Sequence, residues 1–287
     1  MKRLLLLVLL AATVLVPGPL SSADAATKPI APGVQVIVQG AQCTGNFIFR
    51  RKGHPHQVFV GMAAHCSGKG SESDTDGCST PSYPLGTPAQ FVTGANALDG
   101  GTLVGTGRVR YSSWIAMHKA HTHGPAACAY NDFALVQVDA KDLGKVSATI
   151  PQLGGPVGLG KALPAAGSTV YTLGSSSLRG TTQAKSGTVS ARTPWTMTVR
   201  TASPGVPGDS GSGFLDATGH AVGVLSTLDL FPDVGANGVG SLPLEVAFAR
   251  NHGMSGLRLA TGGPFSAQSS SATSAPGLLG GGLLGLL

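Results

Sequence analysis

The sequence has few charged and few aromatic residues. Only 11% of its 287 residues are Asp, Glu, Lys or Arg, and 5% are Phe, Trp or Tyr. So little charge excludes a coiled coil and a nucleic-acid-binding protein built on dense Lys/Arg patches. The hydrophobic content of 42% excludes wholesale disorder, because such a chain can bury a sizeable core. Glycine is abundant instead, with 43 residues beside 19 prolines. This composition favours an all-β domain of short strands joined by tight turns.

The first 25 residues have the pattern of an export signal. Two basic residues precede an apolar run over 4–16, and Ala-Asp-Ala at 23–25 offers the small-x-small site that a signal peptidase cleaves. The apolar run is too short for a comfortable membrane span, although an uncleaved anchor is an alternative. We therefore expect residues 1–25 to be removed and the mature protein to be secreted, with no stable membrane span.

Cysteine is scarce, with four residues at Cys43, Cys66, Cys78 and Cys128. An even number in an exported chain predicts two disulfides, for which the sequence alone permits three pairings. The spacings lack the paired C-x-x-C pattern of a zinc site. We interpret all four residues as structural.

Alternating and apolar runs bounded by glycine, proline and serine predict strands along most of the chain. One short helix is expected over 244–250, because it follows Pro243 and has Glu245 in its first turn. A connector rich in Gly, Pro and Ala over 154–167 divides the domain, expected at 26–261, into two halves, and 262–287 is a low-complexity tail. The expected strands are 34–38, 46–49, 57–60, 133–138, 169–173, 187–191, 196–201 and 221–226.

Three short segments carry residues suited to catalysis. His65 follows an apolar strand, Asp132 opens another, and Ser210 lies within Gly208-Asp209-Ser210-Gly211. Each has an ordinary interpretation on its own: a core histidine, an acid before a strand, and a turn. Together, in this order and in one exported all-β chain, they indicate a catalytic triad.

The chemistry of acyl transfer requires these residue types. A serine hydroxyl is a poor nucleophile until an imidazole removes its proton, and a carboxylate must hold that imidazole in the correct tautomer. We therefore assign Ser210 as nucleophile, His65 as general base and then acid, and Asp132 as the orienting carboxylate. The backbone N–H groups of Gly208 and Ser210 would form the oxyanion hole.

These segments resemble the motifs of the chymotrypsin-like serine peptidases, especially the secreted bacterial members. Ala63-Ala64-His65-Cys66 is similar to the histidine motif, Asp132-Phe133-Ala134-Leu135 to the aspartate motif, and Gly208-Asp209-Ser210-Gly211 to the serine motif. The resemblance covers roughly 34–253. It implies two six-stranded antiparallel β-barrels with the site in the cleft between them and a short C-terminal helix. It also implies a Cys43–Cys66 disulfide, which leaves Cys78 and Cys128 as a second pair.

The chain departs from the family pattern at two points. Ser212-Gly213-Phe214 follows Gly211, where the family usually continues with Gly-Pro. No activation sequence of the Ile-Val-Gly-Gly type occurs near the start of the domain. In animal relatives a new N-terminus pairs with the acid before the nucleophile, here Asp209. We expect Arg179 to take that place, since bacterial relatives can use an internal arginine; the alternative is that Arg179 is a solvated loop residue.

The resemblance also implies where substrate binds. Ser226 and Thr227 belong to the strand that lines the specificity pocket, and Pro204 to the segment where tryptic relatives place an acid. This segment is uncharged, which argues against cleavage after Arg or Lys and favours apolar or small side chains. Asp229 and Asp233 are near enough in sequence to leave the question open.

A histidine-rich stretch at His118, His121 and His123 is a weaker candidate for a metal site. No carboxylate or cysteine completes a coordination shell there, so we interpret it as a solvated loop. We expect no metal and no cofactor.

The sequence therefore predicts a secreted, monomeric serine endopeptidase that acts on proteins or peptides and binds no nucleic acid. The main alternative is a catalytically inactive exported binding protein on the same fold. An esterase is a weaker alternative, because the serine segment is not a G-x-S-x-G elbow and the order His, Asp, Ser differs from that of such hydrolases.

Overall fold

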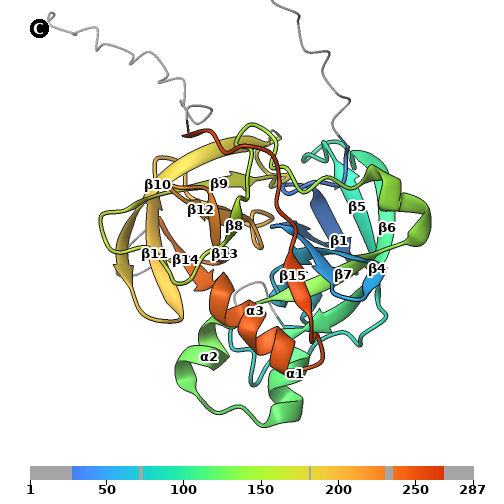
Figure 1. Ribbon diagram of the computed structural model, residues 1–287, viewed down its shortest axis with the longest axis horizontal. Helices are drawn as coiled ribbons and strands as arrows, with labels where there is room; N and C mark the ends of the chain where they lie inside the picture. Colours follow the sequence, from blue (N-terminus) through green and yellow to red (C-terminus); the bar gives the residue numbers. More distant parts are fainter. Residues whose placement is uncertain (1–27, 71–73, 181, 230–234, 268–287) are drawn as a thin grey trace, which may run out of the picture.

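The computed structural model describes residues 28–70, 74–180, 182–229 and 235–267. The chain forms two antiparallel sheets that lie side by side, one from each half of the sequence (Figure 1). The expected signal peptide, Asp233 and most of the expected tail lie outside the described residues. None of the described helices is long and apolar enough to cross a membrane.

The first sheet has the strand order β15-β3-β4-β7-β6-β5-β1-β2. Its eight strands exceed the expected six, because a short strand from the end of the domain adds to the edge of β3 and a two-residue turn folds β2 onto β1. The strands are β1 (Gln35–Val38), β2 (Ala41–Thr44), β3 (Ile48–Arg51), β4 (His54–Met62), β5 (Pro88–Thr93), β6 (Thr102–Ser112), β7 (Ala134–Val138) and β15 (Leu257–Leu259).

The second sheet closes into a six-stranded antiparallel barrel, because β12 pairs with both β9 and β13. The short strand β8 adds to β13 in parallel outside the ring. The double-barrel architecture predicted from the sequence is confirmed. The strands are β8 (Gly158–Leu159), β9 (Thr169–Gly174), β10 (Gln183–Arg192), β11 (Thr196–Thr201), β12 (Gly213–Asp216), β13 (His220–Asp229) and β14 (Ala236–Ser241).

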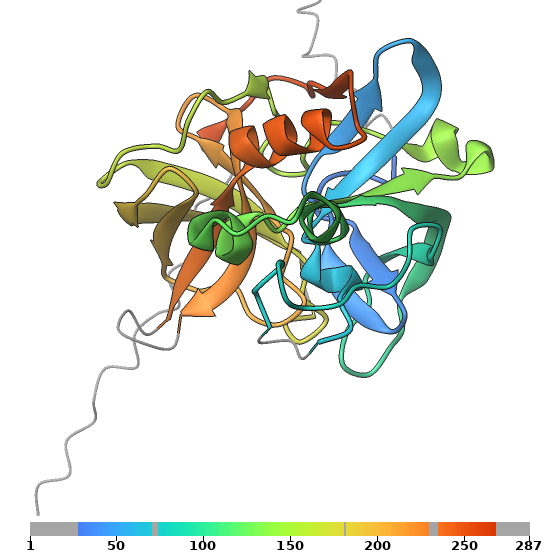
Figure 2. The same ribbon diagram turned by 90° about the horizontal axis from the view of Figure 1, so that it is seen from below.

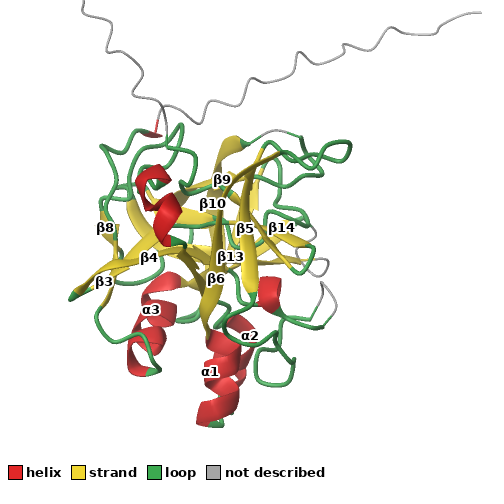
Figure 3. Cartoon of the chain, turned by 90° about the vertical axis from the view of Figure 1, so that its right-hand side faces the viewer, coloured by secondary structure: helices red, strands yellow, loops and turns green. Residues whose placement is uncertain are grey.

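Two α-helices were not expected from the sequence: α1 (Ser113–Ala120) and α2 (Pro125–Tyr130). Both are short, and α1 shows only a weak amphipathic pattern because its buried face includes the small residues Ser113 and Ala116 beside Trp114. The expected C-terminal helix is present as α3 (Leu242–Asn251). The three helices gather below the sheets (Figure 3), and α3 lies across both halves (Figure 2). Two 3₁₀ turns complete the order, η1 (His65–Ser67) and η2 (Ala140–Lys145).

The apolar core extends from the interior of the first sheet across the junction between the halves. Phenylalanines of the first half, among them Phe47, Phe59 and Phe133, are fully buried and form one cluster with Leu215 and Leu242 of the second. A smaller cluster fills the second barrel. Because the larger core is shared, it fixes how the two halves face each other, which matters for any site between them.

Both expected disulfides are present in the structure. Cys43–Cys66 joins β2 to η1, and Cys78–Cys128 ties the loop after η1 to α2. The segments that they connect are short or irregular, so the covalent links restrict loops that have little core of their own.

The expected tail boundary at residue 262 is wrong, because the chain remains packed through residue 266. Gly262 N–H donates to Pro156 O, and Ser266 N–H donates to Leu153 O. Phe265 packs edge-on against Tyr171, with the ring centroids 5.4 Å apart. A glycine-rich composition therefore hid a segment that fastens the connector between the two halves.

Candidate active site

His65 and Asp132 form a directly bonded pair. His65 Nδ1 lies 2.7 Å from Asp132 Oδ2, and the His65 backbone N–H donates to Oδ1 at 2.9 Å. The antiparallel pairing of β4 with β7 brings them together, because Met62 lies opposite Ala134 and each functional residue lies close to that end of its strand. The pairing of the buried, apolar ends of β4 and β7 therefore positions His65 beside Asp132.

The second half of the chain supplies a third hydrogen bond to this carboxylate. Ser226 of β13 donates its hydroxyl to Asp132 Oδ2 at 2.6 Å. Asp132 is 1% exposed. Burial works to raise its pKa, but the adjacent His65 and the hydrogen bonds from His65 and Ser226 outweigh it, so the pKa of Asp132 is lowered. Asp132 is therefore the charged partner that holds the imidazole.

Ser210 lies in a sharp turn that is fastened to β2. Gly208 and Gly211 flank it with φ of +92° and +87°, a conformation that favours glycine. A Cβ on Gly208 would lie 2.4 Å from the side-chain oxygen of Gln42, so a larger residue would displace the Gln42 side chain. The Ser210 carbonyl accepts the Thr44 N–H at 2.8 Å.

The same turn is held by side chains that the sequence did not single out. Gln42 Nε2 and Thr44 Oγ1 donate to the Gly208 carbonyl at 3.0 and 2.8 Å. Both residues come from the first half, so the turn that carries Ser210 is held against the strand that also carries Cys43. No sequence motif marks them, because only the folded arrangement brings β2 beside residue 208.

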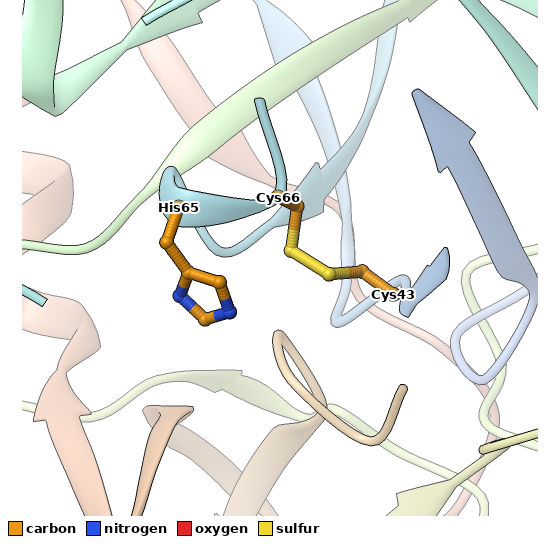
Figure 4. A group of neighbouring side chains, drawn as sticks. All are labelled: Cys43, His65 and Cys66. Carbon is orange, nitrogen blue, oxygen red and sulfur yellow. A yellow bond between two sulfur atoms is a disulfide. The ribbon is translucent and has the colours of Figure 1, made fainter. Parts of the chain in front are cut away.

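His65 and Ser210 line one cavity of about 760 Å³ between the two halves. Figure 4 shows the His65 ring beside the Cys43–Cys66 disulfide, which forms part of the same wall. Among the described residues, the Ser210 hydroxyl has no hydrogen-bond partner, and the N–H groups of Gly208 and Ser210 donate to none. The predicted nucleophile and the predicted oxyanion donors are thus accessible within one cavity.

The predicted substrate-binding residues separate into two groups. Ser226 and Thr227 line the cavity, whereas Pro204 is absent from the described lining residues and its carbonyl accepts a hydrogen bond from Arg179. The neighbouring segment Gly205–Gly208 lines the cavity in its place. Among the described lining residues none is Asp, Glu, Lys or Arg. The side chain of Asp229 and all of Asp233 are outside the described part.

Asp209 is buried and faces two cations. Lys185 Nζ lies 3.4 Å and Arg179 Nε 3.7 Å from Asp209 Oδ2. The carboxylate also accepts the N–H groups of Ser176 and Val206. Lys185 is the more buried cation, with its side chain 10% exposed against 29% for Arg179.

The sequence pointed to Arg179 and missed Lys185. A signal was available, because Lys185, Gly187 and Val189 alternate along β10 and Val189 is fully buried, which places the lysine on the inward face. Burial lowers the pKa of Lys185, an effect that the positive charge of Arg179 increases and that of Asp209 opposes. A lysine as buried as Lys185 needs the Asp209 carboxylate to stabilise its positive charge.

His118, His121 and His123 are exposed around the end of α1. They do not meet in a group with metal-ligand geometry within the described part of the chain. The groups that do meet contain disulfide-bonded cysteines, whose sulfurs are already committed.

Comparison with known proteins agrees with this arrangement. A family model described as a trypsin-like peptidase domain matches residues 63–224, which contain all three predicted triad residues. No curated protein matches the chain.

Solved structures show the same fold at low sequence identity. A Glu endopeptidase solved in complex with MPD is 19% identical, with a TM-score of 0.52 over 80% of this chain and 94% of that one. The thermostable serine protease AL20 from an extremophilic microorganism is 13% identical, with a TM-score of 0.50 over 78% of this chain and 97% of that one. Protease A of Thermobifida fusca is 18% identical, with a TM-score of 0.47 over 81% and 99%.

The pairing around Asp209 gives a testable prediction. Lys185→Met should lower the free energy of unfolding by about 2–3 kcal/mol, because it leaves a buried carboxylate with only its more exposed cation. Arg179→Met should cost less, about 1 kcal/mol. Denaturant unfolding is the measurement, and Lys161→Met at an exposed position is the matched control. A Lys185→Met variant as stable as the control would contradict the pairing.

Proposed function

Because this chain belongs to the trypsin-like peptidase family, we propose that it is a secreted serine endopeptidase that works through a His65–Asp132–Ser210 triad. The observation that carries the proposal is the His65–Asp132 pair, with Nδ1 bonded at 2.7 Å, on the wall of the cavity that Ser210 also lines. Since Nδ1 is bonded to Asp132, the proposal assigns proton transfer with Ser210 to Nε2.

The proposed reaction proceeds in two halves. Ser210 Oγ attacks the peptide carbonyl carbon while its proton passes to His65 Nε2. The same proton then goes to the leaving amine as the C–N bond breaks, which leaves an acyl-enzyme. A water attacks the acyl carbon, gives a proton to Nε2, and releases the acid as that proton returns to Oγ. Asp132 stays ionised throughout and stabilises the imidazolium.

The oxyanion formed in each half-reaction needs donors that are already in place. The N–H groups of Gly208 and Ser210 suit this role, because they donate to none of the described residues. Gln42 and Thr44 donate hydrogen bonds to the carbonyl of Gly208. They therefore hold the Gly208–Asp209 peptide, which lies between the two donors, in place before substrate arrives.

Substrate would lie along β13, with Ser226 and Thr227 on one wall and Gly205–Pro207 on the other. Pro204 would act only through its neighbours, because its carbonyl is bonded to Arg179. The described walls carry no charged side chain beyond His65, so we propose that small or apolar substrate side chains fit best.

The site and the fold fit an exported, single-chain enzyme. Two disulfides are typical of oxidising compartments, which agrees with removal of a signal peptide over 1–25. We propose that the enzyme acts as a monomer on proteins or peptides and needs no cofactor, since the triad supplies base, acid and nucleophile.

An inactive binding protein on the same fold is the alternative. The observation in its favour is that the Ser210 hydroxyl has no hydrogen-bond partner among the described residues. Catalytic hydrogen bonds are often long in enzymes without substrate and shorten in the complex, which is why we favour the enzyme.

Active-site labelling separates the two functions. A fluorophosphonate probe should label the wild-type protein and fail to label Ser210→Ala, because the probe reacts only with an activated serine. Peptidase turnover should fall by about 10³-fold or more in Ser210→Ala and His65→Ala. Ser212→Ala is the matched control, and it should keep the label because Ser212 Oγ is committed to the Asp209 carbonyl. An unlabelled wild-type protein would support the binding protein.

The pH dependence of kcat/KM tests the base. Activity should decline below about pH 6.5, where a histidine takes a proton and can no longer accept one from serine. Asp132 remains charged through this range because its pKa is lowered, so only one acidic limb is expected near neutrality. A rate that is flat from pH 4 to 9 would exclude a histidine base.

A further inference from the structure

A second carboxyl group lies behind Asp132, and the proposed mechanism does not use it. Glu245 on α3 is fully buried, and its Oε1 accepts the Asp132 backbone N–H at 3.3 Å. His65 and Ser226 therefore contact the carboxylate of Asp132, whereas Glu245 contacts its backbone. A fully buried glutamate requires a physical reason, because burial of an unpaired charge is costly.

The fold makes room for this carboxyl. A Cβ on Gly240 would lie 2.6 Å from Glu245 Oε1 and 2.8 Å from the Tyr130 carbonyl. Any other residue at this position of β14 would therefore push the carboxyl away from Asp132. Glu245 lies in the first turn of α3, which follows β14 directly, and this position places its carboxyl group against the Asp132 backbone.

The hydrogen bonds stabilise the ionised form of Asp132 more than that of Glu245. Asp132 accepts three donors, from the His65 ring, the His65 backbone and Ser226. Glu245 accepts one backbone N–H, and its Oε2 has no partner among the described residues. A buried carboxyl group beside a charged one keeps its proton when it has few donors, so the proton belongs on Glu245.

Among the residues that the structure describes, no cation forms an ion pair with Glu245. The titratable groups that face it are Asp132 and, from β6, the buried hydroxyl of Tyr111. The described residues of β13, β14 and α1 that pack against α3 present no buried titratable side chain, and Arg258 of β15 is exposed. Burial first, and the charge of Asp132 second, raise the pKa of Glu245 well above its usual value.

We propose that Glu245 is a positioning residue for the triad: as a neutral acid it fixes the backbone of Asp132 and leaves Asp132 as the single charged carboxyl behind His65. This inference rests on the proposed function for its catalytic meaning. Its structural content, a glutamate that stays protonated at neutral pH, does not depend on catalysis.

Protein stability gives the first test. A group that binds its proton more tightly when folded contributes stability below its unfolded pKa and loses that contribution as pH rises toward its folded pKa. Over pH 5–7 the unfolding constant of the wild type should therefore rise about tenfold more per pH unit than that of Glu245→Gln. Denaturant unfolding in a Ser210→Ala background prevents self-digestion. Asp99→Asn in an exposed loop is the control and should leave the slope unchanged. Equal slopes for wild type and Glu245→Gln would overturn the proposal.

Catalysis gives the second test, in variants that the same denaturant unfolding has shown to be folded. Glu245→Leu removes the acceptor for the Asp132 N–H and should lower kcat about tenfold with little change in KM, and Glu245→Gln should restore most of that loss. In Glu245→Gln the acidic limb of the pH profile should keep its midpoint, because a neutral group replaces a neutral group. A midpoint lowered by about one pH unit would show that Glu245 had been charged.

Infrared spectroscopy keeps the proposal testable if neither variant folds. The wild-type protein at neutral pH should show the C=O stretch of a protonated carboxyl, which an ionised carboxylate lacks. Its absence would overturn the proposal. If the stretch and the stability slope appear but no peptidase activity does, the proposed function fails while the neutral Glu245 stands.

Discussion

The buried carboxylate of Asp132 is the constraint on which the site depends. It is nearly inaccessible to water and lies at the junction of the two halves, so each of its lone pairs needs a donor from the protein. The first half provides the backbone and ring of His65, and the second provides Ser226. The two halves must therefore meet in one relative position, and the large shared core, α3 and the C-terminal segment all act to maintain it.

Three buried carboxyl groups surround this junction, and the structure stabilises each in a different way. Asp132 is held by hydrogen bonds, and Asp209 by Lys185 and Arg179 together with two backbone N–H groups. Glu245 has neither a cation nor a full set of donors. The assignment of a proton to Glu245 follows from this contrast. It leaves one negative charge beside His65, where the proposed mechanism requires an imidazolium, and another beneath the turn that carries Ser210.

The strands and the three candidate motifs carry local signals, whereas the double barrel was inferred from the resemblance of those motifs to a known family. Period-two patterns marked β11 with its observed bounds and most of β9 and β13. The three motifs are contiguous, so they could be identified without the fold. The strands that the sequence missed include four that contain glycine, namely β6, β8, β12 and β14. Gly107 of β6 permits close approach of the β7 backbone, since a Cβ there would lie 2.4 Å from Gln137 O. In the sequence alone, however, a glycine at this position suggests a turn rather than a strand.

The remaining features depend on contacts between segments far apart in the chain. Lys185 reaches Asp209, Gln42 reaches Gly208 and Glu245 reaches Asp132 across 24, 166 and 113 residues. No local pattern encodes such meetings, and a lysine or glutamate in an ordinary strand or helix is usually solvated. Pro204 was predicted to bind substrate, but it is absent from the described cavity lining. Its neighbours line the cavity, while its own carbonyl accepts a hydrogen bond from Arg179.

The most direct test of the account is a double-mutant cycle on kcat/KM with Ser210→Ala, Asp132→Asn and the two combined. Residues that act as one unit are strongly non-additive, so the account predicts that adding Asp132→Asn to Ser210→Ala causes no further loss. Losses that simply multiply would contradict it, because they would show that the carboxylate and the hydroxyl contribute to activity independently.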